Sequence, residues 1–202
     1  MESKIYLASR SPRRRELLHQ IGVRFELLLF RSEPRLDPAI SEVALPGEAP
    51  EAYVVRVARA KASHGTHLID QRHLTSHPVL SADTTLDLDG AIIGKPEDEG
   101  DAATILARLS GRSHRVLTAV AMAQGERLEC VLSISDVRFR QLSSGEIRHY
   151  IASGEPMDKA GAYGLQGRAG MFIEEIRGSP SGIVGLPLCE TALLLRQFGY
   201  PT

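Results

Sequence analysis

The sequence predicts an α/β fold in which a mixed β-sheet borders a cleft. Strand-like and helix-like segments alternate at the start of the chain, whereas its middle contains hairpin patterns, and this combination favours a mixed sheet over a purely parallel one. The length of 202 residues, with 43% hydrophobic and 24% charged residues, is typical of a globular protein of one domain or two closely joined lobes.

The charge balance gives the chain no bulk attraction to a polyanion. Lysine and arginine total 24 against 25 acidic residues, so the net charge is −1, and we expect neither nucleic acid nor an anionic membrane as a partner. Residues 1–9 lack the pattern of a signal peptide, and no apolar run reaches the roughly 18 residues of a membrane span. We therefore predict a cytoplasmic protein in which Cys130 and Cys189 are reduced and serve in packing.

The N-terminal elements are predicted in the order strand, helix, strand. Residues 4–9 form the first strand, after which Ser11 and Pro12 supply the N-cap and first-turn proline of a helix that ends near residue 20. Residues 24–30 have the pattern of a second strand. Residues 31–50 contain four prolines among acidic residues and predict a surface loop, which in a compact domain is often functional.

An amphipathic helix is predicted for residues 50–63. Val54, Ala58 and Ala62 recur there at helical spacing, and basic residues lie between them. Residues 64–78 are polar and irregular and contain four histidines, so we expect a variable connection. A metal site formed by these histidines is disfavoured, since their spacing matches no predicted helix.

The remaining elements follow from alternation, capping residues and turn residues. Strands are predicted at residues 78–82, 86–88, 91–94, 116–123, 130–140 and 171–176, and helices at residues 99–109, 144–152 and 187–198. Asp98 caps the first of these helices, and Ser143 and Glu146 form a capping box at the start of the second. A turn at residues 89–90 joins two of the strands into a hairpin.

Three arginines occupy the first turn of the helix that begins at Pro12. The helix dipole places partial positive charge there, so each cation costs on the order of 0.3–1 kcal/mol, and Arg13 and Arg14 argue for a bound anion such as phosphate. Arg15 is assigned to the solvated side, because three consecutive helical positions fan over about 200°. The alternative is a basic face that is merely solvated.

Two short motifs in the middle of the chain carry groups that can act on phosphates. Asp83 and Thr84 follow an apolar pair, and we expect them where a buried strand ends, at the rim of the cleft, with Asp83 holding a divalent metal or orienting water. Lys95 lies between a glycine and a proline, which suits an ammonium held over a phosphate. Taken separately, Asp83 could instead cap a turn and Lys95 could be an ordinary turn lysine.

The segment 155–167 has neither helical nor strand periodicity and combines acids, a lysine, an amide and three glycines. Glycines permit close approach of the backbone to a ligand, and Gln166 offers a donor and an acceptor that could read a base edge or position water. A solvent-exposed loop without function is the alternative. A second glycine-rich loop, at residues 178–187, either closes the site or simply turns the chain.

Six segments occur in one order that resembles the Maf family. They are LASRSPRRREL (7–17), SADTT (81–85), GKP (94–96), LSGRSHRVLTAV (109–120), EPMDKAGAYGLQG (155–167) and VGLPLCET (184–191). The DKAGAYGxQG form is similar to the branch that hydrolyses dTTP and UTP, whereas the branch acting on 7-methyl-GTP typically has glutamate at the position of Gln166. The match spans nearly the whole chain.

The resemblance implies a single Maf-type domain over residues 1–202, with an elongated mixed sheet flanked by helices and two lobes around a central cleft, the Maf/ITPase-like arrangement. It also implies a homodimer and a nucleoside triphosphate pyrophosphatase that cuts dTTP, UTP or modified pyrimidine nucleotides to the monophosphate and pyrophosphate with Mg²⁺ or Mn²⁺. The alternative is a nucleotide-binding regulator of cell division or septum formation without significant turnover.

The site residues, apart from Thr84, are carried over from the family by position. They are catalytic Asp83, Lys95 and Gln166, substrate-binding Ser9, Arg13, Arg14, Lys61 and Thr84, and metal-binding Glu33 and Asp83. Many members have two consecutive acids at the position of Glu33, but here Pro34 follows it. The role of the second acid is therefore open in this chain.

Overall fold

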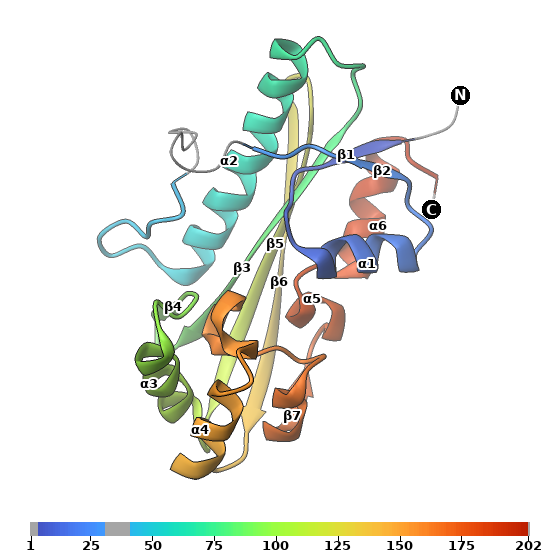
Figure 1. The fold of residues 1–202 in the computed structure, drawn as a ribbon. Helices are drawn as coiled ribbons and strands as arrows, with labels where there is room; N and C mark the ends of the chain where they lie inside the picture. Colours follow the sequence, from blue (N-terminus) through green and yellow to red (C-terminus); the bar gives the residue numbers. More distant parts are fainter. Residues whose placement is uncertain (1–3, 31–40, 202) are drawn as a thin grey trace.

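Seven strands of the described residues form one mixed sheet (Figure 1). The computed structural model describes residues 4–30 and 41–201. The strands are β1 (Ile5–Leu7), β2 (Phe25–Leu27), β3 (Val79–Leu88), β4 (Ala91–Ile93), β5 (Ser113–Gln124), β6 (Arg127–Phe139) and β7 (Ile173–Arg177). Their order is β2-β1-β3-β5-β6-β7, with β4 paired to β3 outside this path. Strand β1 runs parallel to β2 and β3 and the other pairs are antiparallel, so the predicted mixed α/β class is confirmed.

The helices begin where the sequence provides capping residues. They are α1 (Pro12–Gln20), α2 (Pro50–Gln71), α3 (Glu99–Leu109), α4 (Ser144–Ile151), α5 (Pro180–Val184) and α6 (Leu188–Gln197), with short 3₁₀ turns η1 (Glu155–Asp158), η2 (Ala160–Ala162) and η3 (Arg168–Phe172). The side chains of Ser11 and Asp98 accept backbone N–H groups at the starts of α1 and α3, as predicted. Ser143 and Glu146 form the predicted capping box of α4.

Helix α2 continues to Gln71, so the predicted variable connection at residues 64–78 is wrong over its first half. Leu68 and Ile69 are buried and belong to one core cluster with Leu28 and Val79. Gly65 lies where the helix touches β3, and a Cβ at this position would lie 2.6 Å from Val79 Cγ1. The extension packs on the sheet through few apolar residues, and its close contact with β3 requires the glycine. Its mostly polar composition therefore gave no helical pattern in the sequence.

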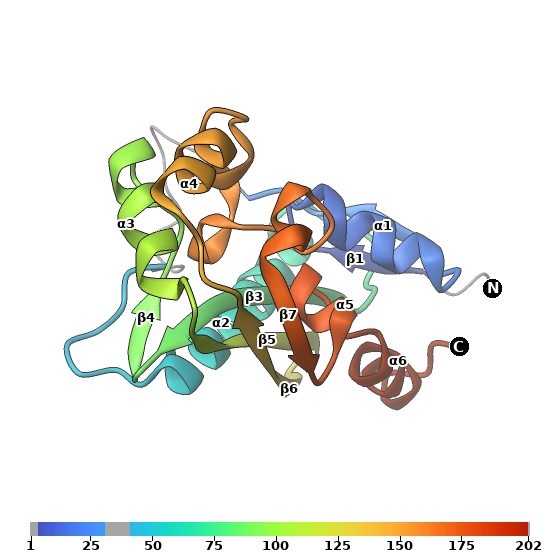
Figure 2. The same ribbon diagram turned by 90° about the horizontal axis from the view of Figure 1, so that it is seen from below.

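The two faces of the sheet are covered by different helices (Figures 1 and 2). Ala119, Ala121 and Ala123 of β5 are fully buried, and their small size lets α2 pack closely on one face. Ser81 Oγ donates to the carbonyl of Ala58 at 2.7 Å and ties β3 to α2. Apolar residues of α1 and α6 pack on the opposite face, while α3 and α4 cover the far end of the long strands.

Strand β3 is continuous through residues 83–85, so the expectation that a strand ends there is wrong. On one side it pairs with β5 from Val79 to Asp87 without interruption. On the other side β1 pairs only as far as Leu80, and β4 begins to pair at Leu86. No described strand pairs with this edge at residues 81–85. We call this unpaired stretch the β3 notch. It forms the rim of the cleft that we had expected from a strand end.

Three smaller predictions also need correction. The predicted loop at 178–187 contains the short helix α5, whose cap is Ser179. Strand β7 begins at Ile173 rather than Met171, because the 3₁₀ turn η3 precedes it. Cys189 is exposed and does not serve in packing, whereas Cys130 is partly buried, and both are free thiols.

Within residues 4–30 and 41–201, no helix has the length and apolar character needed to cross a bilayer.

Candidate active site

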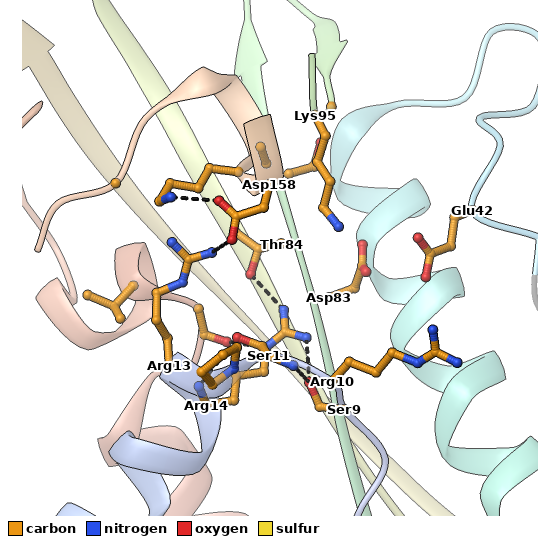
Figure 3. A pocket seen from close by; sticks show the side chains of 18 of the residues that line it. Ser9, Arg10, Ser11, Arg13, Arg14, Glu42, Asp83, Thr84, Lys95 and Asp158 are labelled. Atoms are coloured by element: carbon orange, nitrogen blue, oxygen red, sulfur yellow. Dashed lines mark hydrogen bonds and ion pairs between the residues drawn. The ribbon is translucent and has the colours of Figure 1, made fainter. Parts of the chain in front are cut away.

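A cavity of about 1510 Å³ opens at the β3 notch, between α1, α2 and the segment 155–167 (Figure 3). Small-molecule pockets occupy roughly 300–1,000 Å³, so this cavity has room for a nucleotide and surrounding water. It is lined by all the predicted site residues that the structure describes: Ser9, Arg13, Arg14, Lys61, Asp83, Thr84, Lys95 and Gln166. Glu33 lies outside the described residues.

Two carboxylates share one ammonium group at the α2 side of the cavity. Lys61 Nζ lies 2.6 Å from Glu42 Oε1 and 2.8 Å from Asp83 Oδ1. The Lys61 and Asp83 side chains are largely buried, with 13% and 12% of their areas exposed. Burial opposes ionisation of Glu42, but the positive charges of Lys61, Lys95 and Arg14 together outweigh it, so the pKa of Glu42 lies below its ordinary value. Both carboxylates lie beside the same part of the cleft in Figure 3.

No sequence pattern singles out Glu42 as a site residue. Its loop is fastened to α2 by contacts that only the folded chain creates. Arg56 donates to the carbonyls of Ser41 and Val43, each at 3.0 Å, and Tyr53 Oη donates to the Glu42 carbonyl at 2.9 Å. An acid in a loop follows no periodicity, so its position beside Lys61 could be found only from the structure.

Arg14 is held by three neutral oxygens at the edge of the cavity. Its Nε donates to the Gly185 carbonyl at 2.8 Å, Nη1 to Ser9 Oγ at 3.3 Å and Nη2 to Thr84 Oγ1 at 3.2 Å. A guanidinium has five N–H groups, so two remain for a ligand. Burial lowers the pKa of Arg14, while the nearby Asp83 carboxylate acts in the opposite direction. Arginine stays protonated in proteins, and these neutral partners leave its charge available to an anion.

The start of α1 presents further groups to the cavity. Ser9 Oγ accepts the Ser11 N–H at 3.2 Å, and its own hydrogen has no acceptor among residues 4–30 and 41–201, so it can be donated to a ligand. Arg13 Nη2 lies 3.8 Å from Asp158 Oδ2, so α1 meets the segment 155–167 at this point. Arg15 does not line the cavity, which agrees with its assignment to the other side of the helix.

Lys95 approaches from the opposite side of the notch. It follows β4, is exposed, and points toward Asp83 in Figure 3. The Gly161 N–H donates to the Gly94 carbonyl at 2.8 Å, so the turn that carries Lys95 is joined to the segment 155–167. Gln166 is exposed at the cavity edge, in the same segment.

The donor set of this cavity fits a polyphosphate bound together with a divalent cation. Guanidinium and ammonium groups bind phosphate oxygens, and Arg13, Arg14 and Lys95 provide three of them. Mg²⁺ is commonly held by one or two carboxylates plus substrate phosphates, and Asp83 and Glu42 provide two. Across the described part of the chain, no cluster of three or more His, Cys, Asp or Glu residues could hold a metal. A cation held by Asp83 and Glu42 would complete its coordination with further oxygens, such as those of substrate phosphates or water.

Comparison with known proteins relates this arrangement to one family. A family model described as Maf-like protein matches residues 4–198. A protein of Aromatoleum aromaticum named dTTP/UTP pyrophosphatase is 63% identical over 202 residues, covering 100% of this chain and 98% of that protein. A protein of the same name from Dechloromonas aromatica is 59% identical over 197 residues, covering 98% of each chain. A solved structure of the Staphylococcus aureus Ham1 protein is similar with a TM-score of 0.46 and 12% identity, covering 84% of this chain and 91% of that chain.

The family match spans both sides of the cavity, from β1 to the last turn of α6. The two relatives match over almost the full length of all three chains. This chain belongs to the Maf family.

Proposed function

We propose that this protein hydrolyses dTTP and UTP, together with modified pyrimidine nucleotides, between the α- and β-phosphates to give the monophosphate and pyrophosphate. The observation that carries the proposal is the pair of carboxylates, Asp83 and Glu42, that meets one ammonium opposite the arginines of α1. The names of the two relatives, both dTTP/UTP pyrophosphatase, support the choice of substrate.

The cationic side of the cavity would bind the triphosphate, which carries about four negative charges. Arg13 and Arg14 extend from the start of α1, where the helix dipole also favours an anion. The Ser9 hydroxyl is placed to donate to the same phosphates. Lys95 lies across the notch, where an ammonium would stabilise charge that develops on the leaving pyrophosphate. Thr84 would act through Arg14, because its hydroxyl accepts a hydrogen bond from Arg14 Nη2.

Asp83 would orient the attacking water and accept its proton. Its carboxylate reaches the cavity from the middle of β3, a rigid strand, and one oxygen is fixed by Lys61. Lys61 would hold Asp83 and Glu42 close together before substrate arrives. When bound by Asp83 and Glu42, Mg²⁺ or Mn²⁺ would neutralise charge on the phosphate oxygens. Glu33 is a further candidate ligand from the family resemblance.

Gln166 would act at the segment 155–167, either reading the pyrimidine edge or positioning water, because its amide can donate and accept.

The family resemblance further supports a single two-lobed domain that works as a cytoplasmic homodimer without a nucleic-acid or membrane partner. Light scattering of the purified protein would detect the dimer as a particle of twice the 22.0 kDa chain mass.

A pyrophosphate-release assay over a panel of nucleotides, with Mg²⁺ and with Mn²⁺, tests the proposed activity. We expect turnover of dTTP and UTP and little turnover of purine triphosphates. The Asp83→Asn variant keeps the volume of the side chain but removes its charge and basicity, so we expect at least about a 100-fold lower rate with unchanged melting temperature. If the wild-type protein binds dTTP but releases no pyrophosphate from any nucleotide, the chain is instead a nucleotide-binding regulator.

A further inference from the structure

We propose that Thr118 is a positioning residue that fixes the orientation of Arg14 and thereby the phosphate-binding side of the cavity. The inference rests on the proposed function, in which Arg14 binds a phosphate. Thr118 lies on β5, is only 1% exposed, and does not line the cavity. Contact with substrate therefore cannot account for its hydroxyl.

Thr118 stands directly beside Thr84 in the sheet, since the two are partners in the register of β5 and β3. Their Oγ1 atoms are 2.9 Å apart. On its other side, Thr118 Oγ1 lies 2.8 Å from the carbonyl oxygen of Gly182, in helix α5. Thr84 in turn accepts a hydrogen bond from Arg14 Nη2 (Figure 3). A line of hydroxyl groups thus joins the guanidinium to α5 through the interior of the protein.

The direction of every hydrogen bond in this line is determined by its two ends. A carbonyl oxygen can only accept, so the single hydrogen of Thr118 goes to Gly182. Thr118 must then accept from Thr84, which uses the single hydrogen of the Thr84 hydroxyl. A lone pair of Thr84 is left facing Arg14, whose N–H groups can only donate.

The same line closes into a ring through the backbone of α5. The Gly182 carbonyl also accepts the Gly185 N–H at 3.0 Å, and the Gly185 carbonyl accepts Arg14 Nε at 2.8 Å. Gly185 has a φ of +124°, a conformation that side-chain-bearing residues rarely adopt, and it directs this carbonyl at Arg14. Arg14 is consequently held at Nε and at Nη2 by two chains of hydrogen bonds, and both chains, the two arms of the ring, end on the Gly182 carbonyl.

Removing the Thr118 hydroxyl would release one arm of this ring. The Thr84 hydroxyl would lose its acceptor and could turn its hydrogen toward Arg14, so that an attraction becomes a repulsion. A guanidinium that is free to rotate binds phosphate less tightly, because its orientation must be fixed at the moment of binding. Thr118 would therefore affect substrate affinity without touching substrate.

The test is the isosteric variant Thr118→Val, compared with Thr118→Ser, which restores the hydroxyl. We expect the dissociation constant of inorganic pyrophosphate and the KM for dTTP to rise about three- to tenfold in Thr118→Val, the effect of one lost hydrogen bond. The kcat should change less than about twofold, and Thr118→Ser should stay within about twofold of wild type.

Thr191→Val is the matched control. Thr191 is also fully buried, and its hydroxyl donates to the Pro187 carbonyl at 2.7 Å, at the start of α6 and outside the ring. It should leave both constants unchanged. An equal loss of affinity in Thr191→Val, or wild-type affinity in Thr118→Val, would overturn the proposal.

Two further measurements separate this proposal from the proposed function. In an Arg14→Lys background, Thr118→Val should raise the dissociation constant of pyrophosphate by less than about a further twofold, because its effect passes through Arg14. If Thr118→Val weakens binding there as much as it does in the wild-type background, the proposal is also overturned. The ¹⁵N-resolved Nε–H signal of Arg14, assigned by its absence in Arg14→Lys, should shift or broaden in ligand-free Thr118→Val but not in Thr191→Val. That signal reports positioning even if the wild-type protein cleaves no nucleotide, and an unchanged signal would refute the positioning role by itself.

Discussion

Arg13 and Asp158 meet at one side of the cavity, with Arg13 Nη2 3.8 Å from Asp158 Oδ2. Lys159 Nζ also contacts Asp158, at 2.6 Å, so this carboxylate has a cation of its own. Burial opposes ionisation of Asp158 and the hydrogen bond from Lys159 favours it, so that its pKa is lowered. An arginine that is not needed to balance Asp158 is available for a phosphate.

The substitution Arg13→Ala should therefore reduce substrate affinity without reducing stability. We expect the KM for dTTP to rise at least about tenfold, since a charge-assisted hydrogen bond to phosphate is lost. Stability should stay the same or rise by about 0.3–1 kcal/mol, because a cation is removed from the positive end of a helix dipole. Steady-state kinetics and thermal unfolding measure the two effects.

Arg15→Ala is the matched control for this prediction. It removes the same charge from the same helix turn, but Arg15 does not line the cavity, so the KM should not change. A clear loss of stability in Arg13→Ala together with normal kinetics would instead make Arg13 a structural residue.

The position of Glu42 predicts which loop acid assists the metal. In Glu42→Gln, the concentration of Mn²⁺ needed for half-maximal activity should rise at least about tenfold, because one of two converging carboxylates loses its charge. Binding of Mn²⁺ in the presence of pyrophosphate, followed by electron paramagnetic resonance, should weaken in parallel. If Glu33→Gln shows these changes and Glu42→Gln does not, the metal ligand is Glu33.

The substitution Gln166→Glu should lower activity on dTTP and UTP. A carboxylate lacks the donor of the amide and adds repulsion next to a polyanion. A residue that reads the base should change the ranking of nucleotides, whereas one that positions water should lower all rates by a similar factor. The same rates and ranking as wild type would remove Gln166 from the active site.

A buried histidine predicts how stability depends on pH. Burial lowers the pKa of His114 to about 4, and its Nε2 lies 2.8 Å from Tyr163 Oη. As pH falls below about 6.5 the unfolded chain takes up a proton here, but the folded chain does not until about pH 4. The contribution of His114 is thus constant above pH 6.5, and it lowers stability between pH 6.5 and 4 by on the order of 3 kcal/mol.

Urea unfolding of the wild-type protein and of His114→Gln at pH 7 and pH 4.5 checks this prediction. Glutamine has no ionisation in this range, so the variant should lose less stability on acidification than the wild type. Equal losses in both proteins would show that His114 does not contribute to the acid sensitivity.

Local signals in the sequence predict elements well, while contacts between distant segments do not show in it. Ser11, Asp98 and Ser143 cap helices through neighbours within three residues, so their predictions were confirmed. The extension of α2 depends on Gly65 meeting Val79, a contact between two elements. Comparison with the family by position predicted several residues that line the cavity, but Glu42 was not among them and was found only where its loop folds back against Lys61.

The continuity of β3 has a consequence for how this protein loses activity on heating. Leu80 and Ala82 belong to the core packed on α1 and α6, whereas Leu86 and Leu88 belong to the core packed on α3 and α4. Asp83 therefore sits between two anchored halves of one strand, and neither core can melt without freeing an end of that strand. We expect a single cooperative unfolding transition by calorimetry, with thermal inactivation following the same curve rather than preceding it.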